Sequence, residues 1–167
     1  MTPTLYRDQV AHLAKTNVAK AIEIAEKIQD PWFQAQAWSQ LTRYADKPLT
    51  YSRKAAKSAA QGKDEYQRSA VRAWEIAALA ERKCDLQARR SLNEAVELAV
   101  SIPQISSRAE SLMLLFQAAF KLSNEDADSV AEVLQSSCPL THWRAKRARK
   151  DAAKMLTGEW PPREFFW

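Results

Sequence analysis

Apolar residues recur at intervals of three and four along most of the chain, and prolines or capping residues separate these stretches. This spacing places apolar side chains on one face of an α-helix. Asp30-Pro31 is typical of a helix start, and Gly62 and Gly158 are typical of helix ends. The pattern predicts about nine helices: Thr4–Lys15, Asn17 through Ile28, Pro31 through Ala45, Pro48 to Gly62, Asp64–Lys83, Asp85 to before Pro103, Ser106–Leu122, Glu125–Gln135 and Thr141–Leu156.

The helical pattern also repeats. Residues 21–44 align with residues 95–118, and a third copy between them places Trp74 where the first copy has Trp38. A period of about 36 to 38 residues is the length of a helical hairpin that stacks on its neighbours. We therefore expect an all-α fold, a right-handed α–α superhelix of about four hairpins, in a single domain over residues 1–158. Trp38 and Trp74 are expected to be packing residues.

Two short segments carry a resemblance to a known class of repeat. The stretch from Ala21 to Pro31 resembles the second helix of a tetratricopeptide repeat with its closing proline, and Ala37-Trp38-x-x-Leu41 resembles the opening of the next first helix. The resemblance spans roughly residues 17–158 and implies a TPR-like α-solenoid that binds a protein or peptide along its concave face. It implies no chemistry. Polar positions expected on that face are Gln36, Gln40, Arg43, Arg68 and Arg72.

Composition narrows the function classes further. Two glycines in the whole chain argue against phosphate-binding loops, and no apolar run is long enough to span a membrane. Cys138-x-x-x-His142 offers two metal ligands, whereas zinc sites need three or four. The N-terminus lacks a signal-peptide pattern. We expect a cytoplasmic, non-enzymatic scaffold with no metal, no cofactor and no membrane partner.

Charge is distributed unevenly near the C-terminus. Residues 124–137 hold four acidic and no basic side chains, whereas residues 138–158 hold six basic and one acidic. The last predicted helix would bury its alanines and present on its other face Trp143, Lys146, Arg147, Lys150 and Lys154. Cations with an aromatic ring among them fit phosphates and bases, so nucleic-acid binding is the alternative function. The competing interpretation is a solvated cap, with Trp143 covered by the tail and paired with Arg147.

The tail, residues 159–167, is unusually apolar for a chain terminus. It contains Trp160, Phe165, Phe166 and Trp167. Exposed together, these rings would form an aggregation-prone patch. We expect the tail to fold back and cap the last hairpin. The alternatives are a peptide that docks on a partner or the contact of a weak homodimer, the chain being otherwise a monomer.

Overall fold

The computed structural model describes residues 1–166 of the 167-residue chain, and this part is helical with no strand. Its helices are α1 (Pro3–Leu13), α2 (Val18–Lys27), α3 (Pro31–Tyr44), α4 (Pro48–Ala59), α5 (Glu65–Ala70), α6 (Arg72–Glu81), α7 (Asp85–Val100), α8 (Ile105–Ala119), α9 (Asn124–Ser137) and α10 (Trp143–Leu156). A single residue, Val71, separates α5 from α6, so together they form the expected fifth helix. With this pair counted as one, the predicted all-α fold of nine helices is confirmed for the described residues.

Local signals set most helix boundaries. The Asn17 side chain accepts a hydrogen bond from the amide of Lys20, and the Asp30 carboxylate accepts from the amide of Trp32, as N-caps do. Gly62 has a different role from the expected helix end. It lies beyond the end of α4 without a positive φ, and a Cβ there would lie 3.0 Å from the Cβ of Gln67. Gly62 therefore permits the close approach of the turn to α5.

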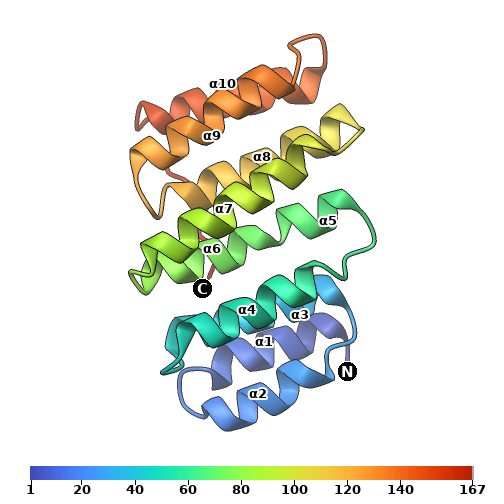
Figure 1. The fold of residues 1–167 in the computed structure, drawn as a ribbon, viewed down its shortest axis with the longest axis vertical. Helices are drawn as coiled ribbons and strands as arrows, with labels where there is room; N and C mark the ends of the chain where they lie inside the picture. Colours follow the sequence, from blue (N-terminus) through green and yellow to red (C-terminus); the bar gives the residue numbers. More distant parts are fainter. Residues whose placement is uncertain (167) are drawn as a thin grey trace.

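The helices stack in two rows (Figure 1). The first row is α1, α3, α5–α6, α8 and α10, and each of these packs on the next. The second row is α2, α4, α7 and α9, and each pairs with its neighbours in the first row. α6 and α8 have partners on several sides, which explains why their sequences are apolar almost all round.

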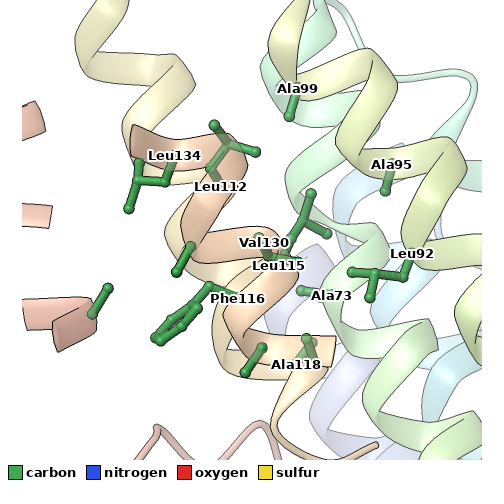
Figure 2. Close-up of a cluster of buried hydrophobic side chains, with 14 of the residues drawn as sticks. Ala73, Leu92, Ala95, Ala99, Leu112, Leu115, Phe116, Ala118, Val130 and Leu134 are labelled. Atoms are coloured by element: carbon green, nitrogen blue, oxygen red, sulfur yellow. The ribbon is translucent and has the colours of Figure 1, made fainter. Parts of the chain in front are cut away.

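Small and large apolar side chains interlock between the rows. Figure 2 shows Leu112 and Leu115 of α8 in one cluster with Val130 and Leu134 of α9, while the Phe116 ring points to the side away from the alanines of α7. Alanine at so many contacts lets helix axes approach closely. A second cluster around Trp38 joins α1 to α4. No helix among the described residues is long and apolar enough to cross a bilayer.

The tail turns back along the first row. Trp160 stays beside α10, but Phe165 is only 3 % exposed and meets Trp74 of α6 edge to face. Residues 163–166 of the tail thus contact α3, α6 and α8 in the middle of the stack, whereas Trp160 lies against α10 at its end. Trp167 is outside the described residues.

Candidate functional site

α10 divides its residues between a buried and an open face. Ala145, Ala148 and Ala152 are buried against the preceding helices, as their spacing predicts. Trp143 on the opposite face is 62 % exposed, and the Arg147 side chain is 73 % exposed. The five residues expected to form an anion-binding patch, Trp143, Lys146, Arg147, Lys150 and Lys154, therefore share one side of the helix, and they line a common cavity.

The end of α10 adds a second tryptophan to this face. Gly158 has a φ of +78°, and the amide of Glu159 donates to the carbonyl of Lys154, which reverses the chain after the last turn. Trp160 consequently returns alongside the helix, with the Lys154 Nζ 4.2 Å from the centroid of its ring. Trp160 was predicted to belong to the tail, and its position beside α10 was not predicted. The available signal was the glycine, because a left-handed residue directs the next two residues back over the helix.

We call Trp143, Lys146, Arg147, Lys150, Lys154 and Trp160 the α10 surface. Together with Asp151 they surround an open depression of about 410 Å³. Its cations are only partly neutralised: Arg147 lies 3.8 Å from Asp151, and Lys154 lies 3.8 Å from Glu159. Lys146 and Lys150 are exposed and make no salt bridge with residues 1–166. The surface therefore presents positive charge with exposed aromatic rings at both ends.

Trp143 has different neighbours from those of the solvated-cap interpretation. The ring stacks on His142 at a centroid distance of 6.3 Å, and the guanidinium carbon of Arg144 lies 5.1 Å from its centroid. Arg144 in turn forms an ion pair with Glu110 of α8. Of the tail residues, Arg163 and Phe165 lie on Trp74 instead, and Trp160 lines the same depression as Trp143. A second depression, of about 340 Å³, lies between α8 and α10 on the other side of Trp143.

The expected concave-face residues separate into two groups. Gln36, Gln40 and Arg43 lie together near the tail, but the first two are buried and each is already hydrogen-bonded. Arg43 forms an ion pair with Glu81 at 2.7 Å and lies over the ring of Phe166. These three side chains are engaged by the chain itself.

Arg68 and Arg72 lie elsewhere and hold the fold together. Arg68 donates to the carbonyl of Gly62 at 2.7 Å, fixing the turn before α5. Arg72 pairs with Glu75 on its own helix and with Glu94 on α7. The structure therefore does not bring all five predicted contacts onto one binding face.

Glu75 is a buried acid that the sequence analysis did not single out. It is 2 % exposed, and its carboxylate accepts a hydrogen bond from Ser91 at 2.8 Å. Burial raises the pKa of Glu75, while Arg72 and Ser91 oppose this effect. The signal was present in the sequence, because Glu75 follows Arg72 by three residues inside an apolar run. Its partners satisfy it, so it links α6 to α7.

No group of three or more metal-ligating side chains comes together within residues 1–166. Cys138 is fully buried, and burial raises the pKa of its thiol. The His142 Nδ1 accepts from the amide of Arg144 and caps α10. In the described structure the Cys138–His142 pair thus has packing and capping roles.

Fold and surface together define an all-helical protein of stacked helices with an exposed basic and aromatic face at one end. The chain matches no protein-family model, no curated protein and no solved structure at a significant level.

Proposed function

We propose that the protein is a non-catalytic binding module whose α10 surface binds single-stranded nucleic acid. The observation that carries the proposal is the placement of Trp143 and Trp160 at opposite ends of a row of four cations. A helix rises about 1.5 Å per residue, so the backbone positions of residues 143 and 154 are roughly 16 Å apart along the axis. That span suits a short stretch of sugar–phosphate backbone.

Single strands fit this surface better than duplex. Unpaired bases expose ring faces on which an aromatic side chain stacks, a contact worth about 1–3 kcal/mol per base. Lys146 and Lys150, unpaired among the described residues, would contact phosphates. Duplex DNA hides its base faces and would contact only the cations. The net charge of +5 favours association with any polyanion, so the preference for single strands rests on the two tryptophans.

Peptide binding along a TPR-like concave face, which the sequence favoured over nucleic-acid binding, becomes the second candidate function. It has less support than the α10 surface, because Gln36, Gln40 and Arg43 are occupied within the chain. A cytoplasmic location and a monomeric state are part of the proposal.

The test is a fluorescence-anisotropy titration with a labelled 12-nucleotide single strand, at low and at physiological salt. The wild type is compared with Lys146→Glu/Lys150→Glu and with a matched control, Arg53→Glu/Lys57→Glu. The control changes two exposed cations on α4 with the same spacing and the same change in net charge. We expect a Kd of about 10 µM at physiological salt, within the range of non-specific binding, tighter binding at low salt, and at least a tenfold loss in the α10 variant only.

Two further probes test whether the surface prefers single-stranded nucleic acid over other polyanions. A duplex of the same sequence and a poly-glutamate peptide of similar charge should both bind more weakly than the single strand. The proposal would be overturned if both charge-reversal variants lost affinity equally, or if single strand, duplex and poly-glutamate bound equally well. Binding would then be a general effect of the protein's positive charge.

A further inference from the structure

The end of the tail sits on the first row of helices as a bound peptide would. The Phe165 ring is 5.4 Å from the Trp74 ring, centroid to centroid, at an interplanar angle of 82°. The ring of Phe166 lies under the Arg43 guanidinium, whose carbon is 4.2 Å from the ring centroid. Two successive aromatic side chains therefore have separate sites, one on α6 and one at the C-terminal end of α3.

Polar contacts position the residues just before the two rings. The Arg163 amide donates to the Gln117 side-chain oxygen at 3.0 Å, and Glu164 forms an ion pair with Lys121 at 3.1 Å. The Arg163 guanidinium lies over the Trp74 ring, 5.4 Å from its centroid. A backbone hydrogen bond, an ion pair and two ring contacts together restrict both the sequence and the chain direction of a segment that can bind here. We call Arg43, Trp74, Gln117 and Lys121 the tail site.

The tail does not fill the space beside it. A cavity of about 200 Å³ adjoins the rings of Phe165 and Phe166, and Trp32, Gln36 and Gln40 form part of its wall. Side chains on both sides of the cavity are polar as well as aromatic, so the space suits a larger occupant with hydrogen-bonding groups. Phe165 itself is buried in the same cluster as Leu112 and Phe116, so the cavity is free space beside a well-packed anchor.

The connection from α10 to the docked residues makes few contacts. Pro161 and Pro162 lack amide hydrogens, and Pro161 is exposed. The preceding backbone bonds end at Trp160, whose amide donates to the carbonyl of Lys154. Residues 163–166 can consequently leave their site while the helices keep their own hydrogen bonds.

We propose that the tail is a built-in peptide ligand, and that the tail site binds a partner protein through a segment of the same chemistry. That segment has a basic residue, an acidic residue and then two aromatic residues, as in Arg163–Phe166. The tail competes with the partner from within the chain, at an effective concentration in the millimolar range that is typical of short linkers. This site is separate from the α10 surface and does not depend on the nucleic-acid proposal.

The test uses the full chain and a labelled peptide with the sequence of residues 158–166. The wild type should bind this peptide weakly, because its own tail occupies the site. Phe165→Ala removes the competing anchor, so affinity for the peptide should rise at least tenfold. Adding Trp74→Ala to that variant should abolish the gain, and a peptide with Arg163 and Glu164 exchanged should bind poorly.

Phe166→Ala provides a second variant with a milder structural effect, because Phe166 is only half-buried. It should raise peptide affinity by a smaller factor than Phe165→Ala does. If both variants keep the wild-type circular dichroism and neither binds the peptide more tightly than the wild type, the tail is a fixed part of the core and the proposal fails. Strong binding of the exchanged peptide would overturn it equally, because the site would then select no sequence.

Discussion

The tail site and the α10 surface are built from the same kinds of residue and differ in what covers them. In the tail site, Arg163 lies over Trp74 and the ring of Phe165 meets the same indole, so cation and aromatic groups satisfy each other. On the α10 surface, Lys154 lies over Trp160 but Trp143 is mostly exposed. Composition therefore does not separate a closed cluster from an open binding surface. What distinguishes the two is the path of the chain after Gly158, which brings residues 163–166 onto the tail site and leaves Trp143 exposed.

Repeat-equivalent residues illustrate the same point. Trp38 is buried and stacks on Tyr51 of the adjacent helix, as packing residues of a hairpin do. Trp74 holds the equivalent sequence position, yet its edge contacts are with Trp32 and with Phe165 of the tail. The tail thus gives the second copy a neighbour that the first copy lacks.

The largest expected effect is a difference in stability between variants of Trp74 in the tail site and Trp143 on the α10 surface. Trp74→Ala should lower the free energy of unfolding by about 3 kcal/mol, because it removes the ring on which Trp32, Arg163 and Phe165 pack. Trp143→Ala should change it by less than about 0.5 kcal/mol, as exposed substitutions usually do. Urea denaturation of both variants measures the difference. Equal losses would mean that Trp143 is a packing residue and would break the comparison.

The sequence predicts the rows of helices well because helix formation depends on local signals. The three- and four-residue spacing, the Asn17 and Asp30 caps and the alanine-rich stripes of α10 act over one or two turns. The open face of α10 follows from the same periodicity. The helices and their buried faces are accordingly the part of the structure that can be predicted from the sequence pattern.

Contacts between segments far apart in the sequence could not be predicted from the helical pattern. The ring pair of Phe165 and Trp74 joins residues that no helical period relates. Gln36 and Gln40 accept hydrogen bonds from Arg7 of α1 and from Arg43, one turn further along α3. The repeat pattern predicted that Gln36, Gln40 and Arg43 line an accessible face. It could not predict that the chain's own tail lies there, because this depends on the path of the chain after Gly158.

A smaller effect is expected from the glycine that positions Trp160. Gly158→Ala places a side chain at a φ of +78°, a conformation that costs about 1 kcal/mol for a residue with a Cβ. The substituted Cβ has no heavy atom within 4 Å, so strain and not collision is the cause. The chain reversal should loosen and Trp160 should move away from Lys154. We expect a modest fall in thermal stability and a roughly fivefold loss of affinity for the single strand, within the range that one stacking contact supplies.

That variant has an internal control. Trp160→Ala removes the ring but leaves the helix end intact, so it should lose the same affinity while keeping the stability of the wild type. If Gly158→Ala weakens binding and Trp160→Ala does not, the second tryptophan is not part of the α10 surface. The surface would then depend on its cations and Trp143.

The smallest expected effect concerns the salt dependence of binding to the α10 surface. Each phosphate contact with a single strand contributes about −0.7 to the slope of log affinity against log salt concentration. Lys150→Gln removes one exposed cation that has no salt bridge with the described residues, so the slope should become shallower by about 0.7. Lys121→Gln removes a cation that pairs with Glu164 in the tail and should leave the slope unchanged. Titrations at four salt concentrations resolve these slopes, and a change in the Lys121→Gln slope would place phosphate contacts on the tail site as well.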